Sequence, residues 1–207
     1  MLTRAECLEF YKKIDMPPHI RRHCMLVAEV SLFLGRLLNC NGSRLDLNMI
    51  ELGALLHDVG KERSLVTGED HAVLGAEMLT GIAPPGATRI VREHIWLEPS
   101  HIEGPITESL LVNYSDKRVK HEEVVSVEAR YHDLIARYAK TPVHRRRLLE
   151  KLNLYLELEK KIFLHLNIEP KGREIMGIKL TLTEGAGSEN NGNKEAHCGI
   201  AGGGEIG

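Results

Sequence analysis

Apolar side chains recur along most of the chain at the three- and four-residue spacing of an α-helix, and almost no segment alternates as a β-strand does. His23, Val27, Val30 and Leu34 show this spacing clearly and lie on one stripe of a helix predicted over 19–38. Further helices are predicted over 3–14, 46–59, 70–80, 85–97, 107–119, 126–138 and 141–166. The pattern predicts an all-α fold in which His23 lies on a buried face.

Residues with strong preferences for helix ends support these boundaries. The predicted N-terminal caps are Thr3, Asp70, Thr107, Ser126 and Thr141, the last followed by Pro142 at the first helical position. Gly60 is predicted to stop the third helix in the left-handed conformation that is common just after a helix. In the seventh helix, the side chains predicted to face inward are Tyr131, Leu134, Ile135 and Tyr138.

The C-terminal segment differs in composition from the rest. Residues 184–207 are rich in glycine and have almost no large apolar side chains. Such a segment cannot offset the entropy of being ordered, so a disordered tail is predicted there. The stretch IMGIKLTLT at 175–183 fits either a strand or a linker. The expected organisation is a helical domain over 1–169, with its core at 19–140, and a linker and tail over 170–207.

Composition narrows the classes of function. The 207 residues are 43% apolar and 27% charged, as in an ordinary globular domain. A net charge of −2 and few aromatic residues argue against nucleic acid as the main partner. The N-terminus has no apolar signal core, no uninterrupted apolar run reaches the ~20 residues that span a bilayer, and the four cysteines are scattered. We therefore expect a cytoplasmic protein without a membrane partner; a homo-oligomer is compatible with the sequence.

The neighbouring residues His57 and Asp58 are the first candidates for chemistry in a chain with eleven histidines. Adjacent side chains on a helix point about 100° apart, so both reach one ion only where the helix ends or the ion lies between two faces. The predicted stop at Gly60 provides such an end. With His23 and Asp116 on two other helices, these residues could enclose a metal in the core of a helical bundle.

The types of ligand indicate the metal. Two imidazoles and two carboxylates without a thiolate suit Fe²⁺, Mn²⁺, Co²⁺ or Zn²⁺ better than Cu⁺, Mg²⁺ or Ca²⁺. Four protein ligands on an octahedral ion leave two positions for water and substrate. This arrangement is typical of a hydrolytic centre.

A larger motif resembles a known family. In chain order, the matching segments are His23, LLHDVGK at 55–61, His71, His94 and SDKR at 115–118. They resemble the HD superfamily of metal-dependent phosphohydrolases over roughly 19–140. The branch with a His-Asp-Ile-Gly signature matches best, with Val59 in the place of the isoleucine, and the paired histidines of the cyclic-dinucleotide branch do not follow His94. The resemblance implies an HD-domain helical bundle, here with a long C-terminal helix.

The resemblance also implies roles for individual residues. The ligands of a first metal would be His23, His57, Asp58 and Asp116. His71 and His94 would either complete a second metal site, with Asp58 bridging, or contact phosphate as imidazolium ions. Asp58 would also orient the attacking water. Lys61, together with Lys117 or Arg118, would neutralise charge on the substrate phosphate. One or two divalent transition-metal ions per chain are therefore expected.

The function implied is hydrolysis of a phosphate ester or anhydride in a small molecule, a nucleotide in the first instance, by a water that the metal activates. Two alternatives remain open. One is an HD-type di-iron oxygenase, which uses a similar set of four histidines and two aspartates. The other is a non-catalytic module that binds a metal or a nucleotide.

Overall fold

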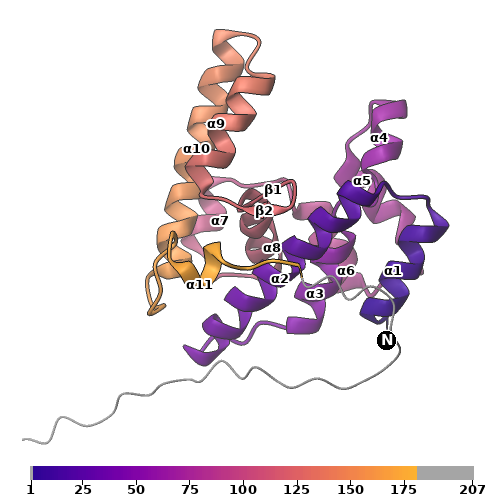
Figure 1. The fold of residues 1–207 in the computed structure, drawn as a ribbon, viewed down its shortest axis with the longest axis horizontal. Coiled ribbons are helices and arrows are strands. Elements are labelled where there is room, and N and C mark those ends of the chain that lie inside the picture. The colour runs from indigo at the N-terminus through magenta and orange to yellow at the C-terminus, as the bar shows by residue number, and fades with distance from the viewer. Residues whose placement is uncertain (1, 181–207) are drawn as a thin grey trace, which may run out of the picture.

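The computed structural model describes residues 2–180, which form helices and one short β-hairpin (Figure 1). The helices are α1 (Arg4–Lys13), α2 (Pro18–Cys40), α3 (Leu47–Leu56), α4 (Lys61–Thr67), α5 (His71–Met78), α6 (Pro85–Glu93), α7 (Pro99–Glu103), α8 (Glu108–Lys117), α9 (Val127–Tyr138), α10 (Pro142–Phe163) and α11 (Arg173–Met176). Strands β1 (Val119–Lys120) and β2 (Glu123–Val124) pair antiparallel, with Val119 opposite Val124. The predicted all-α class is confirmed, whereas the predicted tail at 184–207 lies outside the described residues.

Capping residues fix the starts of five helices where the sequence predicts them. Each side-chain oxygen accepts a hydrogen bond from a backbone N–H in the first turn, which would otherwise lack a partner. The caps are Thr3, Asp70, Thr107, Ser126 and Thr141.

The elements that the sequence did not predict are all short. Helix α4 has seven residues and buries none of them, and α7 has five residues. Elements of this length make too few core contacts to leave an apolar period in the sequence. Two predicted helices are also shorter than expected, because α3 ends at Leu56 and α6 ends at Glu93.

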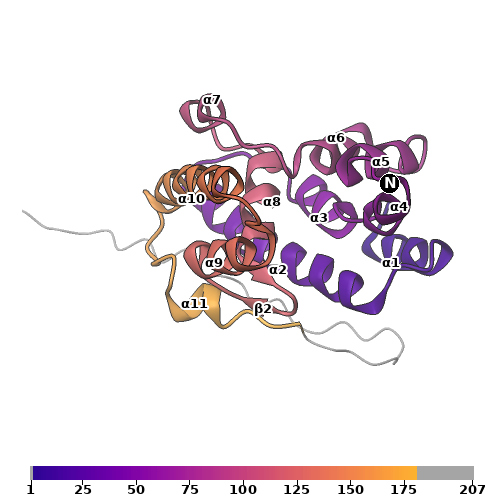
Figure 2. The same cartoon turned by 90° about the horizontal axis from the view of Figure 1, so that it is seen from above.

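Helices α2 and α8 lie at the centre of the molecule. Helix α2 packs along α3 and α8, and α3 packs in turn on α6 and α8. Seen from above, α1 and α3–α6 lie on one side of this centre, and α9–α11 lie on the other (Figure 2). Helices α9 and α10 pack together and project as an arm, with α4 rising opposite them (Figure 1).

Helix α2 is long and apolar enough to cross a membrane by length and composition, and within residues 2–180 it is the single helix that is. In the fold, however, 61% of its most apolar window is buried against other elements. The burial of α2 in the core of the domain therefore explains why this helix is apolar.

The end of α9 departs from the predicted orientation. Tyr131 and Ile135 are buried as expected, but Tyr138 is 59% exposed. The last turn of α9 extends into the arm beyond the core, so residues that continue the same stripe no longer meet apolar partners.

Arg118 is fully buried and joins distant parts of the chain. Its guanidinium donates hydrogen bonds to the Tyr114 hydroxyl at 2.6 Å, the Val125 carbonyl at 2.7 Å and the Pro170 carbonyl at 2.7 Å. The Glu159 carboxylate lies 3.4 Å from the same guanidinium and accepts a hydrogen bond from Tyr114. Arg118 therefore ties α8 to the hairpin, to α10 and to the segment before α11. This burial contradicts its predicted contact with a substrate phosphate.

We expect Arg118→Met to lower the free energy of unfolding by ~3–5 kcal/mol, because Glu159 would remain charged and buried without its cation. The measurement is urea denaturation followed by circular dichroism. Arg92→Met, at an exposed position of α6, is the control and should change stability by less than ~0.5 kcal/mol. Equal effects of the two substitutions would contradict a structural role for the Arg118 network.

Candidate metal centre

The structure brings together all six side chains that the sequence predicts as ligands. They come from five places in the chain, most of them at helix ends: His23 in α2, His57 and Asp58 just after α3, His71 at the start of α5, His94 just after α6 and Asp116 near the end of α8. Five of them are buried, and His71 is partly exposed. Residues separated by more than 90 positions thus meet in one cluster.

The turn that carries His57 and Asp58 is shaped by Gly60, although not as predicted. Gly60 has φ −81° and ψ −5°, which is a right-handed conformation open to any residue, so the predicted left-handed stop is wrong. A Cβ atom on Gly60 would instead lie 2.3 Å from the His71 carbonyl oxygen and 2.5 Å from the Gly75 amide nitrogen. Glycine is therefore required because α5 approaches the backbone here. That approach brings His71 next to Asp58.

One part of the cluster centres on Asp116. The Asp116 Oδ1 lies 3.0 Å from His23 Nε2 and 3.8 Å from His57 Nε2. The His57 Nε2 also lies 3.6 Å from the Asp58 Oδ2. One potential ligand atom from each of His23, His57 and Asp116 falls within 4.8 Å of the others.

The other carboxylate oxygen of Asp58 faces a second part of the cluster. Its Oδ1 lies 3.4 Å from His71 Nε2 and 3.8 Å from His94 Nε2, and these two nitrogens are 3.1 Å apart. The two oxygens of Asp58 therefore face two different groups of donors.

Backbone carbonyls fix the orientation of two imidazoles. His57 Nδ1 lies 2.7 Å from the Ala54 carbonyl oxygen, and His94 Nδ1 lies 2.6 Å from that of Val91. A carbonyl only accepts, so each Nδ1 carries the proton and each Nε2 turns a lone pair toward the cluster. The His57 Nε2 is buried and has no hydrogen-bond partner within the described part of the chain. A buried polar atom without a partner lowers the stability of the fold, and a metal ion bound to this nitrogen would be the missing partner.

The protonation states suit metal binding. Burial lowers the pKa of His57, and burial together with the neighbouring His57 lowers the pKa of His94 to about 3. Burial alone would raise the pKa of Asp58, but His57 and Lys61 hold it well below its usual range. At neutral pH these groups are neutral imidazoles and a carboxylate, which are the forms that bind metals. His94 is accordingly unsuited to the alternative role of a phosphate-binding imidazolium.

The donor set and its spacing fit a divalent transition metal. Two ligands placed ~2.1 Å from an ion at a right angle are ~3.0 Å apart. The closest contacts of the cluster, 3.0 Å for His23–Asp116 and 3.1 Å for His71–His94, match this separation. Imidazole and carboxylate ligands together suit Fe²⁺, Mn²⁺, Co²⁺ and Zn²⁺.

The two predicted phosphate-binding lysines occupy different positions. Lys61 Nζ lies 2.6 Å from Asp58 Oδ2, and its half-exposed side chain also lines a cavity. Lys117 contacts Asp116 Oδ2 and lies over the Tyr155 ring, and its side chain is not among those that line the cavity. Lys61 therefore faces both the cluster and the space beside it, whereas the phosphate contact of Lys117 stays a prediction.

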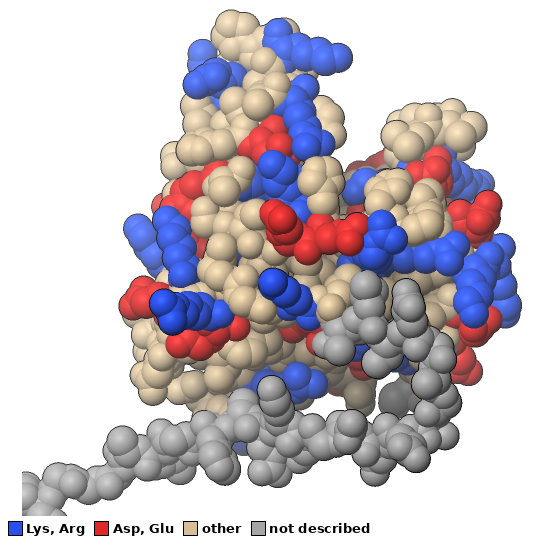
Figure 3. Space-filling view, in the orientation of Figure 1, with Lys and Arg blue, Asp and Glu red and all other residues tan. Residues whose placement is uncertain are grey.

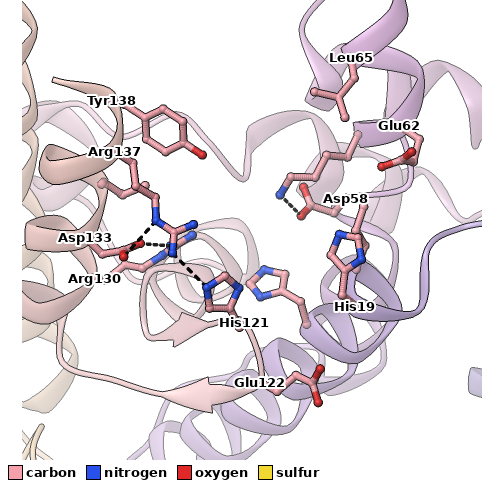
Figure 4. A pocket seen from close by; sticks show the side chains of 14 residues that line it. His19, Asp58, Glu62, Leu65, His121, Glu122, Arg130, Asp133, Arg137 and Tyr138 are labelled. Atoms are coloured by element: carbon pink, nitrogen blue, oxygen red, sulfur yellow. Dashed lines mark hydrogen bonds and ion pairs between the residues drawn. The ribbon is translucent and has the colours of Figure 1, made fainter. Parts of the chain in front are cut away.

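The cavity beside the cluster has a volume of about 290 Å³ (Figure 4). Asp58, Lys61 and His23 line it. Across from Asp58, the wall is made by residues that the sequence reasoning did not single out: His121, Arg130, Asp133 and Arg137, with Tyr138 beside them (Figure 4). Arg130, Asp133 and Arg137 recur at spacings of three and four, so helical periodicity applied to charged residues could have found them.

Comparison with known proteins agrees with this geometry. The sequence model of the HD domain matches residues 20–141, more than half of the chain. An uncharacterized protein of Methanocaldococcus jannaschii is 36% identical over 77 residues, which cover 35% of this chain and 44% of that protein. A tRNA (cytidine(56)-2'-O)-methyltransferase of Thermoplasma volcanium is 30% identical over 58% of this chain and 39% of its own. The chain thus spans less than half the length of these curated relatives.

Two further similarities are more limited. A bifunctional uridylyltransferase/uridylyl-removing enzyme of Mycobacterium tuberculosis is 42% identical over 59 residues, which cover 24% of this chain and 7% of the enzyme. The crystal structure of a predicted HD superfamily hydrolase from an uncultured Thermotogales bacterium aligns over 78% of this chain and 91% of its own. Its TM-score is 0.43 and its sequence is 19% identical.

We expect Gly60→Ala to destabilise the protein and to weaken metal binding, because the added methyl group would push α5 and His71 away from Asp58. Overpacking of this kind costs ~1–3 kcal/mol. Urea denaturation and Mn²⁺ titration measure the two effects. Gly104→Ala is the control, since a Cβ at Gly104 meets no atom within 4 Å. A Gly60→Ala protein as stable as Gly104→Ala would contradict the close approach.

Proposed function

Because the chain belongs to the HD domain family, we propose that it is a metal-dependent phosphohydrolase that cleaves a phosphate ester or anhydride of a small molecule, a nucleotide in the first instance. One observation carries the proposal: six buried or half-buried imidazole and carboxylate donors converge beside a cavity that Lys61 and Asp58 line. Imidazoles and carboxylates together form a site for a hydrolytic metal.

We assign the donors to two ions. His23, His57, Asp116 and one oxygen of Asp58 would hold the first ion. His71, His94 and the other oxygen of Asp58 would hold the second. When bound, the ions would act as Lewis acids that lower the pKa of a water and neutralise charge on the phosphoryl oxygens. The orientation of the two Asp58 oxygens toward different donor groups supports this division.

The protein side chains would position the reactants. Lys61 donates a hydrogen bond to Asp58 Oδ2 and still has N–H groups free to turn toward the cavity. It would donate to a phosphoryl oxygen and offset the negative charge that develops there during attack. Asp58 is held in its charged form by the same contact and would orient the attacking water. The hydrogen bonds of His57 and His94 to backbone carbonyls keep the ligand nitrogens in place while substrate enters.

The name of one relative agrees with a nucleotide substrate. The Mycobacterium tuberculosis protein is named in part as a uridylyl-removing enzyme, and removal of a uridylyl group breaks a bond to a nucleotide phosphate. The match spans a small part of that protein, so it supports the class of substrate and leaves its identity to experiment.

We expect the purified protein to hydrolyse p-nitrophenyl phosphate or a nucleotide in the presence of Mn²⁺ or Fe²⁺, and Asp58→Ala to abolish this activity. Both proposed ions would lose a ligand, so the variant should also lose metal, while its circular dichroism spectrum stays the same. Unchanged turnover and full metal content in Asp58→Ala would contradict the proposed centre. Consumption of O₂ by the iron-loaded protein would indicate the di-iron oxygenase instead.

The assignment of two ions gives a separate prediction. After loading with excess Mn²⁺ and desalting, the wild-type protein should contain about two metal equivalents by elemental analysis. His71→Ala and His94→Ala should each contain about one, because the first group of donors is left intact. His101→Ala, at an exposed position, is the matched control and should keep two. A wild-type protein that never exceeds one equivalent would overturn the assignment.

A further inference from the structure

The wall of the cavity that lies across from Asp58 is rich in basic groups. Arg130, Asp133 and Arg137 project from α9, and His121 projects from the turn between β1 and β2 (Figure 4). Asp58 lies across the cavity from them in the same view. In the space-filling view, Lys and Arg side chains follow the edge of the α9–α10 arm beside the hollow that separates it from α4 (Figure 3).

The charges of this wall do not balance. Three cations surround the single carboxylate of Asp133: Lys120 Nζ at 3.0 Å, Arg137 Nε at 3.1 Å and an Arg130 terminal nitrogen at 3.6 Å. The nearby Glu122 is paired elsewhere, with Arg22 at 2.7 Å. The cluster around Asp133 therefore carries an excess of two positive charges at neutral pH.

The hydrogen-bonding capacity of the wall is also incomplete. Arg130 Nε is buried and has no hydrogen-bond partner within the described residues, and 3.6 Å is too long for Arg130 to bond Asp133 Oδ2, which is likewise unsatisfied. A network built for stability alone would satisfy these atoms. Arg137 bonds Asp133 through Nε and reaches His121 Nε2 at 3.2 Å, and its other N–H groups have no acceptor among residues 2–180.

The turn that presents His121 joins two paired strands. Lys120 pairs with Glu123, which leaves a two-residue turn at 121–122. His121 has φ +55°, the left-handed conformation that the first position of such a hairpin turn requires. The turn places the imidazole against Arg137 at the edge of the cavity.

We propose that Arg130 and Arg137 form a second phosphate subsite, so that the preferred substrate carries two phosphoryl groups, one at the metal centre and one at α9. This inference rests on the proposed phosphohydrolase function. A phosphate group supplies the negative charge that balances the cluster and acceptor oxygens for the N–H groups of Arg130 and Arg137, and guanidinium groups bind phosphate through paired N–H donors. A nucleoside diphosphate is the simplest compound of this class.

The cavity suits such a compound. Its volume of about 290 Å³ is near the lower end for small-molecule sites, which suits two phosphoryl groups better than a whole nucleotide. Tyr138 is 59% exposed and Leu65 is 78% exposed, and they lie on opposite sides of the mouth (Figure 4). An aromatic ring and an apolar side chain at the entrance provide contacts for a nucleobase outside the cavity.

The reaction balances for a phosphoanhydride. The oxygen of a water forms a bond to the phosphorus at the metal centre, and the bond from that phosphorus to the bridging oxygen breaks. The second phosphoryl group leaves with the bridging oxygen and one proton of the water. Arg130 and Arg137 would bind this leaving group.

Steady-state kinetics with Mn²⁺ tests the subsite by comparing ADP, with two phosphoryl groups, and p-nitrophenyl phosphate, with one. We expect Arg137→Ala to lower the ratio of kcat/KM for ADP to that for p-nitrophenyl phosphate by ~10-fold or more, mainly through KM, since a hydrogen bond to a charged group is lost. Arg137→Lys should recover part of the ratio. Arg146→Ala removes an equal charge from an exposed position of α10 and should leave the ratio unchanged.

The outcomes separate this inference from the function on which it rests. If Arg137→Ala and Arg130→Ala both keep the wild-type ratio while both substrates are hydrolysed, the subsite is wrong and the phosphohydrolase stands. If the wild-type protein hydrolyses neither substrate, calorimetric binding of inorganic pyrophosphate to the Mn²⁺-loaded protein decides the subsite separately. Tenfold weaker binding by Arg137→Ala than by Arg146→Ala would support the subsite, and equal binding would overturn it. Arg130→Gln provides a second substitution should Arg130→Ala fail to fold.

Discussion

The burial of the Asp58 carboxylate is the constraint around which the domain is organised. A charged carboxylate removed from water costs several kcal/mol unless cations or hydrogen-bond donors surround it. Its cationic partner here is Lys61, and the Nε2 atoms of three imidazoles from different elements face it within 3.8 Å, where bound metal ions would complete its environment. The turn after α3, the start of α5 and the end of α6 must therefore meet at one point. The close passage of α5 over Gly60 and the central position of α2 and α8 both serve this convergence.

Helix ends make this convergence possible. A side chain at the end of a helix can point along the axis, so ligands from antiparallel neighbours meet without opening the packing of the core. His57, His71, His94 and Asp116 all lie within about one turn of a helix end. Burial lowers the pKa of His57 and His94, and these two imidazoles are oriented by carbonyls three residues earlier in the chain. Burial and a backbone carbonyl therefore leave each of these two imidazoles with a lone pair on Nε2 and direct it toward the cluster.

Much of this could be predicted from the sequence, because it depends on local signals. The long helices follow from apolar spacing, and five caps follow from residue preference. The six donors follow from a motif of His and Asp residues in a set order along the chain. What could not be predicted depends on contacts between distant segments. The need for glycine at position 60 comes from α5, and the burial of Arg118 comes from Glu159 and Pro170, more than 40 residues away. Helix α4 buries no residue, so the sequence has no apolar periodicity there from which the helix could be predicted.

The cavity draws its two walls from separate stretches of the chain, with the donors supplied by residues 23–116 and the basic wall by residues 121–137. Selection can therefore act on the two walls almost independently. Substitutions of the α9 residues that line the cavity remove none of the side-chain contacts of Asp58, so new ligand preferences can arise without first passing through an unstable protein. In an enzyme lineage, such a division favours the spread of one reaction over many compounds. Helix α9 is therefore the element to mutate first in order to change which ligands this protein binds.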